Sequence, residues 1–340
     1  MVVTEEKLNR LREIIGGAPK KIALLCHTNP DGDTIGAALA WRSYLERLGH
    51  ATCCIAPNRY PYFLEWMTDI GHIGVFKDDT DGRMARFIGE ADVIFCMDFN
   101  QINRLDRVTD TVTANTTAVR VLIDHHLHPP VDGYAVQFSD THACSTSYIV
   151  YQLLVGLGGT DAIDEAMAES LYVGIMTDTG NFSFSNLTSD LFRAAAVLID
   201  KGVNVPYVNS SVYNNFSEGR MRLLGYMLND KMVTDYEFGV AYVSLTEEEM
   251  RRFDFTQGDS EGFVNYPLSI RGIRMSAMFS QTKHSIRVSL RSRGEVDVNV
   301  FARRYFEGGG HRNAAGGRSY VSMEETLANF RTYLREYFGA

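Results

Sequence analysis

The chain has 340 residues, of which 45% are hydrophobic and 22% are charged, and its formal net charge is -9 at pH 7. This length is sufficient for two domains, each with its own core. No apolar run approaches the ~18 residues of a membrane span, and the N-terminus lacks a secretory hydrophobic segment. The composition therefore predicts a cytoplasmic protein with no membrane partner.

The charge is distributed unevenly along the chain. Residues 271–340 contain twelve Lys or Arg against six Asp or Glu, which leaves a net -15 for residues 1–270. An acidic body argues against holding long duplex nucleic acid on a broad basic surface, whereas a basic C-terminal part is compatible with a small anion. The five cysteines form no C-x-x-C pair, so neither a disulfide framework nor a structural zinc site is expected.

The N-terminal two thirds of the chain alternate helical and strand patterns. An amphipathic helix capped by Thr4 comes first. Short apolar runs, typical of buried strands, lie at 21–26, 51–56, 91–98 and 117–124, and helical patterns lie at 36–49, 145–158, 163–176 and 187–202. This alternation is typical of a parallel α/β sheet.

The pattern changes after a polar stretch. Residues 217–230 are helical in pattern, and 238–245, 270–281 and 284–294 alternate with period 2 before a closing helix at 324–338. Period 2 favours an antiparallel sheet. We predict an α/β protein with a parallel-sheet domain at 1–204, a linker helix within 205–236, and a smaller α/β domain with a mixed or mostly antiparallel sheet at 237–340.

Acidic and histidine residues follow several apolar runs. The first run leads into His27-Thr-Asn-Pro-Asp31-Gly-Asp33, the third ends on Asp98, and the fourth ends on Asp124-His125-His126. A further acid, Asp178, follows the apolar stretch of a predicted helix. The carboxyl ends of parallel strands line one crevice, so these groups are expected to converge.

Each motif alone has a simpler interpretation. Asn-Pro-Asp-Gly is an ordinary turn, Asp98 is a strand-end residue, and Asp-His-His is a polar loop. Turn chemistry does not require His27 or Asp33, however, and several converging carboxylates repel one another unless cations neutralise them. Oxygen and imidazole ligands without thiolates suit a Mn²⁺-type ion, and their number is about right for two ions that share a carboxylate. The motifs together favour a metal site.

These motifs resemble the four motifs of the DHH phosphoesterases, and 289–317, with its Gly-Gly-Gly-His block, is similar to the DHH-associated domain, type 1. Within that family the length and domain order resemble the nanoRNase and pAp phosphatase group, some of whose members are called exopolyphosphatase-related proteins. The resemblance implies that His27 and Asp31 hold one Mn²⁺ ion and that Asp98 bridges to a second ion held by Asp33, His125 and Asp178. It further implies that His126 contacts the scissile phosphate and that Asp124 orients a histidine. Phe99-Asn100 and Glu307 depart from the family pattern and put only local loop shape and substrate preference in doubt.

The C-terminal part offers a second set of candidate residues. Glycines can turn backbone N–H groups toward an anion, and arginine can grip a phosphate with two donors. Alternation places Arg287 and Arg291 on one strand face. We therefore expect Arg287, Gly309 and Gly310 to contribute to anion binding, and the resemblance implies that Arg291, Ser292 and His311 bind the nucleotide end of a substrate.

The function implied is Mn²⁺-dependent hydrolysis of short oligoribonucleotides to mononucleotides, and removal of the 3′-phosphate of pAp to give AMP, through a two-metal mechanism with a bridging hydroxide. Four alternatives stay open: a manganese pyrophosphatase or exopolyphosphatase, a phosphodiesterase for linear dinucleotides such as pApA or pGpG, a non-catalytic nucleotide sensor, and a processive exonuclease. The sensor is disfavoured because every presumed ligand is present. The exonuclease is disfavoured because the chain has no basic track for a long strand. A homodimer is compatible with the sequence.

Overall fold

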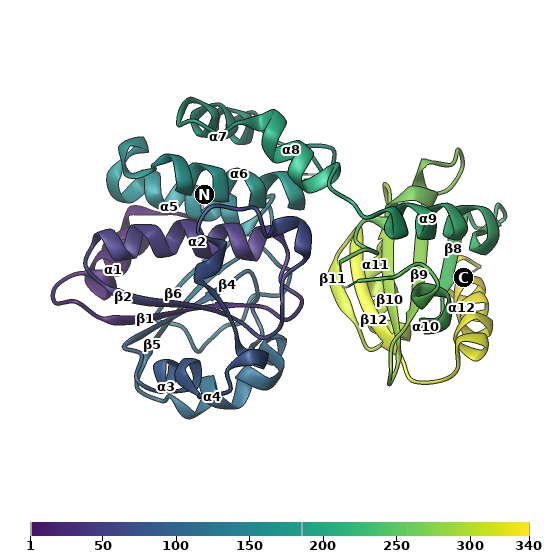
Figure 1. Ribbon diagram of the computed structural model, residues 1–340, viewed down its shortest axis with the longest axis horizontal. Helices are drawn as coiled ribbons and strands as arrows, with labels where there is room; N and C mark the ends of the chain where they lie inside the picture. The colour runs from purple at the N-terminus through teal and green to yellow at the C-terminus, as the bar shows by residue number, and fades with distance from the viewer. Residues whose placement is uncertain (1, 185, 257, 340) are drawn as a thin grey trace. The chain divides into compact units, whose positions relative to one another are not determined.

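A computed structural model describes residues 2–184, 186–256 and 258–339 (Figure 1). The chain divides into two compact units, Met1–Asn215 (unit 1) and Phe216–Ala340 (unit 2), and each is described by itself. Within the described ranges no helix has both the length and the apolar character needed to cross a membrane.

Unit 1 is built on a six-stranded sheet in the order β3-β2-β1-β4-β5-β6, and every pair of neighbouring strands is parallel. The strands are β1 (Lys21–Cys26), β2 (Ala51–Ala56), β3 (Ile73–Val75), β4 (Val93–Met97), β5 (Val119–Asp124) and β6 (Val136–Ser139). The predicted parallel α/β architecture is thus confirmed. The sequence pattern missed β3 and β6, which are short strands at the two edges of the sheet.

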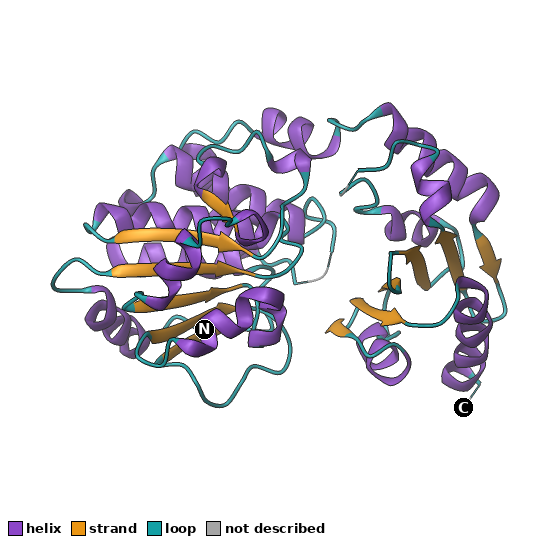
Figure 2. Cartoon of the chain, turned by 60° about the horizontal axis from the view of Figure 1, so that its bottom comes forward, coloured by secondary structure: helices purple, strands orange, loops and turns teal. Residues whose placement is uncertain are grey.

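Helices cover both faces of this sheet (Figures 1 and 2). The α-helices of unit 1 are α1 (Glu5–Ile15), α2 (Gly32–Arg47), α3 (Arg83–Gly89), α4 (Thr109–Ala114), α5 (Thr146–Gly158), α6 (Glu165–Asp178), α7 (Ser189–Asp200) and α8 (Val205–Tyr213). Along β1, Leu24 and Cys26 belong to one apolar layer and Ala23 and Leu25 to the other. Burial on both faces explains why the strands read as continuous apolar runs. The predicted cap of α1 is confirmed, since the Thr4 side chain accepts a hydrogen bond from the Lys7 backbone N–H at 3.3 Å.

Helices α2 and α6 cross at close range beside the carboxyl end of the sheet. Gly36 of α2 lies against the backbone of α6, where an added Cβ would meet the Ser170 carbonyl oxygen at 2.2 Å. At Gly174 of α6 an added Cβ would lie 1.9 Å from the Ser147 hydroxyl oxygen. Only glycine fits at these two crossings, and a larger residue would push α2, α5 and α6 apart.

Unit 2 contains a second six-stranded sheet in the order β11-β12-β10-β9-β8-β7. The strands are β7 (Val233–Asp235), β8 (Val240–Leu245), β9 (Met275–Gln281), β10 (Ile286–Ser292), β11 (Gly309–His311) and β12 (Ala314–Ser319). β8 and β9 are parallel and the other neighbours are antiparallel, so the predicted mixed sheet is confirmed.

The two faces of this sheet are covered differently. The helices of unit 2 are α9 (Glu218–Tyr226), η6 (Met227–Lys231, one turn of π-helix), α10 (Glu247–Arg251), η7 (Phe263–Ser269), α11 (Val298–Tyr305) and α12 (Met323–Phe338). α11 and α12 pack on one face, where Phe279, Val288 and Leu290 meet Phe301 and Phe330. On the opposite face α9, η6 and η7 pack on Val243, Leu245 and Met278, which belong to β8 and β9.

Two segments differ in detail from the sequence pattern. The helical stretch expected at 217–230 corresponds to α9 and η6 of unit 2, whereas the sequence pattern did not indicate α8, which ends at Tyr213 in unit 1. The glycine-rich block, for which the sequence pattern indicated no strand, forms one: Gly309 and Gly310 lie in β11, opposite Gly316 and Ala315 of β12. Glycine is required for this pairing because an added Cβ on Gly310, with φ of 150°, would lie 2.5 Å from the Ala314 carbonyl oxygen.

Candidate metal centre

Three neighbouring groups of side chains that could hold a metal ion meet at the carboxyl end of the unit 1 sheet; two contain the expected ligands, and the third contains Asp98, Asp124 and His126. The first contains His27, Asp31 and Asp98. His27 follows β1, and its Nε2 lies 3.3 Å from Asp98 Oδ2 and 3.8 Å from Asp31 Oδ2. The other ring nitrogen, Nδ1, lies 2.9 Å from the Thr28 carbonyl oxygen. A hydrogen bond there leaves Nε2 as the atom available for an ion.

The second group contains Asp33, His125 and Asp178. His125 Nε2 lies 3.4 Å from Asp178 Oδ2, 3.8 Å from Asp33 Oδ2 and 3.3 Å from Asp98 Oδ1. The two oxygens of Asp98 therefore face different groups: Oδ2 faces His27 and Oδ1 faces His125. A carboxylate in this position can serve two ions at once.

The architecture explains how distant residues meet here. Asp33 lies in the first turn of α2 and Asp178 is the last residue of α6, so the tight crossing of these helices brings the two acids together. Asp98 follows β4 in a left-handed conformation with φ of 66°, and its N–H donates to the Ile123 carbonyl oxygen of β5 at 2.9 Å. Aspartate is one of the few residues that accept this conformation at moderate cost.

The N-terminus of α5 holds two of the carboxylates, a feature that sequence reasoning missed. The backbone N–H groups of Thr146 and Ser147 donate to the Asp33 carboxylate at 2.6 and 2.8 Å. The Thr146 hydroxyl donates to Asp98 Oδ1 at 2.8 Å. The predicted helix beginning at Ser145 was the available signal, since the first N–H groups of a helix favour an anion.

The Asp124-His125-His126 segment is held by its own hydrogen bonds. Asp124 is fully buried and its Oδ1 lies 2.8 Å from His126 Nδ1. Its second oxygen accepts the His126 backbone N–H at 3.1 Å. Asn100, which departs from the family pattern, donates from Nδ2 to the Leu127 carbonyl oxygen at 2.9 Å and so supports the loop after His126.

Burial and mutual charge shift the pKa values of these groups. Burial raises the pKa of Asp33 well above its usual range, and the charges of Asp98 and Asp178 raise it further. Burial raises the pKa of Asp178 to about 6, although His125 opposes the shift. Burial also opposes ionisation of Asp98, but hydrogen bonds with His125 and His27 outweigh it and hold the Asp98 pKa well below its usual range. Burial lowers the pKa of His125, but the charge of Asp178 and contacts with Asp98 outweigh this and raise it well above its usual range.

The two acids at the rim are the exposed part of the cluster. The side chains of Asp31 and Asp178 are 51% and 30% exposed, whereas those of Asp33 and Asp98 are 1% and 2% exposed. A ligand therefore reaches the cluster from the side of Asp31 and Asp178. The donor set of carboxylates and imidazoles, without a thiolate, fits a hard divalent ion such as Mn²⁺.

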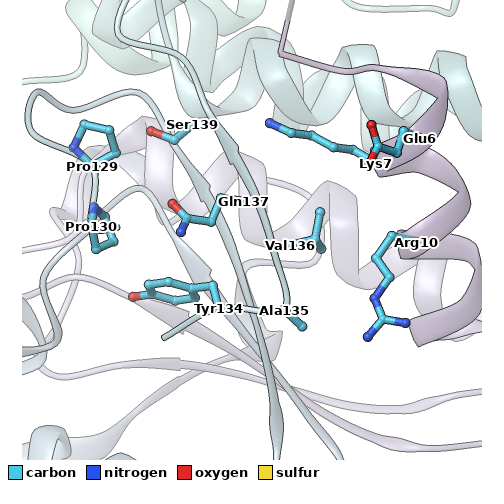
Figure 3. A pocket seen from close by; sticks show the side chains of 10 residues that line it. All are labelled: Glu6, Lys7, Arg10, Pro129, Pro130, Tyr134, Ala135, Val136, Gln137 and Ser139. Carbon is cyan, nitrogen blue, oxygen red and sulfur yellow. The ribbon is translucent and has the colours of Figure 1, made fainter. Parts of the chain in front are cut away.

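A separate pocket of about 490 Å³ lies away from this cluster, between α1 and the edge strand β6 (Figure 3). Lys7 and Arg10 of α1, Tyr134, and Gln137 and Ser139 of β6 contribute to its lining. None of the candidate metal ligands lines it.

The candidate substrate residues of unit 2 fall into two sets. The β-sheet register places Arg291 opposite Ala314, and Ala314 opposite His311, so Arg291 and His311 project on the same face. Arg287 projects on that face as well, four residues earlier on β10. Ser292 differs, because it is 7% exposed and its hydroxyl donates to the Val296 carbonyl oxygen at 2.6 Å.

The glycines of β11 have structural partners. The Gly310 N–H donates to Asn299 Oδ1 at 3.0 Å, which ties β11 to α11. Gly309 pairs with Gly316 of β12. The predicted substrate roles of Ser292, Gly309 and Gly310 stay predictions.

Comparison with known proteins is consistent with this arrangement. Residues 21–175 match the DHH family, N-terminal domain, and residues 236–340 match the DHHA1 domain. The chain is 32% identical over 222 residues to the Bacillus subtilis bifunctional oligoribonuclease and PAP phosphatase NrnA, covering 63% of this chain and 68% of that protein. It is 27% identical to the Thermus thermophilus protein of the same name, over 92% of this chain and 88% of that one.

A solved structure extends the likeness to the whole fold. The crystal structure of an exopolyphosphatase-related protein from Bacteroides fragilis has a TM-score of 0.92 and 37% identity, and the match covers 99% of this chain and 97% of that one. The fold and these relatives define a hydrolase of the phosphoesterase class. The chain belongs to the DHH family and carries the DHHA1 domain at its C-terminal end.

Proposed function

We propose that this protein hydrolyses very short oligoribonucleotides to mononucleotides and removes the 3′-phosphate of pAp. The observation that carries the proposal is the pair of ligand groups that share Asp98, one oxygen toward His27 and the other toward His125. The names of the Bacillus subtilis and Thermus thermophilus relatives, which combine an oligoribonuclease with a PAP phosphatase, support the choice of substrates.

The chain's own residues fit two divalent ions, for which Mn²⁺ is our proposal. His27, Asp31 and Asp98 would hold one ion, and Asp98, Asp33, His125 and Asp178 the other. Such ions, when bound, polarise the phosphoryl oxygens and acidify a water molecule. The Thr146 hydroxyl and the α5 N–H groups keep the Asp98 and Asp33 carboxylates in place for this purpose.

His126 and Asp124 complete the catalytic residues that we propose. The Asp124 carboxylate would accept a hydrogen bond from His126 Nδ1–H, which would keep the proton on that nitrogen and fix the orientation of the ring. The other ring nitrogen of His126, Nε2, would then face the phosphate or leaving oxygen on which charge develops.

Unit 2 supplies recognition in this proposal. The Arg291 guanidinium and His311, which share one face of the sheet, bind a phosphate of the nucleotide. Ser292 lies on the opposite face of β10, and its hydrogen bond to the Val296 carbonyl oxygen fixes the strand end that carries Arg291. Gly309 and Gly310 shape the strand that carries His311. Residues 205–236 act as the connection between the two functions.

Two further functions of the same class compete with this one, namely pyrophosphate or polyphosphate hydrolysis and cleavage of linear dinucleotides such as pApA or pGpG. The non-catalytic sensor is disfavoured because all six proposed metal ligands are present and adjacent. A cytoplasmic location and a homodimer also stay predictions.

Initial rates with Mn²⁺ on four substrates test the proposal: pAp, a 5′-phosphorylated dinucleotide, an RNA of two dozen nucleotides and pyrophosphate. We expect fast turnover of the first two and little of the others. Fastest turnover of pyrophosphate would overturn the assignment and leave the arginine face of unit 2 without its proposed ligand. No turnover of any substrate with Mn²⁺ or Mg²⁺ would favour the sensor.

A further inference from the structure

One face of the unit 2 sheet is covered only in part. α9, η6 and η7 cover β8 and β9 through Val243 and Met278. On the same face β10 and β12 carry Arg287, Ser289, Arg291, Gly316 and Arg318, none of which is buried. We call the face formed by these five residues the arginine strip.

Arg287 and Arg318 stand directly opposite each other at one end of the strip. Both side chains are exposed, and directly opposed residues on antiparallel strands have Cβ atoms only about 4.5–5.5 Å apart. Like charges in that position destabilise a sheet. The arrangement therefore lowers the stability of unit 2 unless an anion occupies the space between the two guanidinium groups.

Among its described residues the protein itself supplies no such anion, and neither guanidinium forms an ion pair or a hydrogen bond there. Arg312 of the same unit shows the contrast, because it pairs with Glu295 at 2.7 Å. The neighbouring polar residue on β9 is Ser280, a hydroxyl that can add a third donor.

An aromatic ring lies close by in the chain. Tyr320 follows Arg318 by two residues and is 65% exposed. An exposed ring beside cationic side chains is the combination by which proteins hold single-stranded nucleic acid, through stacking and phosphate contacts.

The distance between Arg287 and Arg291 along β10 determines how long a ligand must be to reach both. Arg287 and Arg291 are four residues apart on β10, which at about 3.4 Å per residue corresponds to about 14 Å. Two phosphates of one nucleotide do not span that distance. A stacked strand rises about 3.4 Å per nucleotide along its axis, so the distance from Arg291 to Arg287 corresponds to no more than about four nucleotides.

We propose that Arg287 and Arg318 form a second phosphate-binding subsite, which holds a distal phosphate of an oligonucleotide whose terminal phosphate is bound at Arg291 and His311. The subsite rests on the proposed function for the chemical class of the ligand. It adds affinity for short oligonucleotides over pAp, because pAp is too short to reach it.

The dissociation constants of two oligonucleotide or nucleotide probes for the Arg318→Gln variant and for the unaltered protein test the subsite without relying on hydrolysis. The probes are pAp and a 5′-phosphorylated tetra-adenylate, titrated onto the metal-free protein in the presence of a chelator. We expect the ratio of the two dissociation constants to shift by about tenfold against the tetra-adenylate, the scale of losing one charge-assisted contact. We also expect the slope of log affinity against log salt for the tetra-adenylate to become shallower by about 0.7.

Arg331→Gln is the matched control, because Arg331 is an exposed arginine on α12, which packs on the opposite face of the same sheet. We expect its two dissociation constants to equal those of the unaltered protein. Equal weakening of both probes by Arg318→Gln, no change in either, or no binding of tetra-adenylate to the unaltered protein would overturn the subsite.

The same variants separate this inference from the proposed function. If Mn²⁺-dependent hydrolysis of pAp and a dinucleotide is absent but the binding ratio shifts, the proposed function fails and the subsite stands. If hydrolysis is present and the ratio stays constant, the subsite fails and the proposed function stands.

Discussion

The two sheets of this protein arrange their candidate functional residues in opposite ways. In unit 1 every strand runs in the same direction, so residues that follow β1, β4 and β5 meet at one edge, and the candidate ligands form a buried cluster around Asp98. In unit 2 antiparallel neighbours place Arg287, Arg291 and Arg318 along an open face. A parallel sheet concentrates charge at a point, which suits a metal-assisted reaction. An antiparallel face spreads charge along a line, which suits recognition of a chain of phosphates.

The largest loss of activity is expected from a change at Asp98, at the centre of the candidate metal cluster of unit 1. Asp98→Asn removes the negative charge shared by both ligand groups while its amide oxygen can still accept from Thr146. We expect kcat to fall by more than about 10³-fold on every substrate. Mn²⁺ titration followed by calorimetry, with circular dichroism as a control for folding, would show whether ion binding is lost. Retained activity on any substrate would contradict the assignment of Asp98.

A smaller effect is expected from the support of that site. Thr146→Val keeps the side-chain shape but removes the hydroxyl that donates to Asp98 Oδ1. Losing a hydrogen bond behind a metal ligand costs about 10–100-fold in metal affinity or activity. The Mn²⁺ concentration for half-maximal rate would rise, and Thr146→Ser should restore it. Equal values for the Val and Ser variants would mean that the hydroxyl does not position Asp98.

Arg291→Ala tests whether unit 2 contributes to substrate recognition. We expect kcat/KM for pAp to fall by about tenfold, since one charged phosphate contact is lost. The rate on pyrophosphate should change much less, because the reacting groups that we propose all belong to unit 1. A parallel assay of both substrates measures this selectivity. The same loss on both would show that the division between chemistry and recognition does not hold.

The smallest effect concerns acid stability, where unit 2 has an ion pair unrelated to either face. Partial burial of Glu249 raises its pKa, but hydrogen bonds from Lys231, Thr246 and Tyr226 outweigh burial and lower it to about 2. A carboxyl with a lowered folded-state pKa stabilises the fold fully above its unfolded pKa of about 4.3, and this contribution is lost as the pH falls toward 2.

Unit 2 should therefore unfold more easily in denaturant as the pH is lowered through this window. Glu249→Gln should make the urea midpoint of unit 2, followed by tyrosine fluorescence, less dependent on pH between about 4.3 and 2. An unchanged pH dependence in this variant would exclude Glu249 as the source.

The sequence pattern was most informative where a local rule has a global consequence. Four apolar runs, each buried on both faces, indicated parallel strands, and parallel strands oblige His27, Asp98 and His125 to meet at one edge. Thr4 was recognisable as a cap because capping depends on residues only three positions apart. Period 2 along β10 likewise placed Arg287 and Arg291 on one face.

Other features left no local signal. The glycine-rich strand β11 has no apolar alternation, and its pairing with β12 depends on close backbone contact that only glycine permits. The short strands β3 and β6 form because long neighbouring strands supply their hydrogen-bond partners. The bonds from Thr146 to Asp33 and Asp98 join residues 113 and 48 positions apart.

By itself the sequence determined the class of fold, the types of side chain in the candidate metal site and the edge of the sheet where those side chains gather. Burial, strand direction and residue chemistry are properties of short segments. Only the tertiary structure decided which oxygen of Asp98 faces which histidine, and that Arg318 stands opposite Arg287. Those outcomes depend on helix crossings at Gly36 and Gly174 and on the register between strands. Both are set by packing among residues that are far apart in the chain.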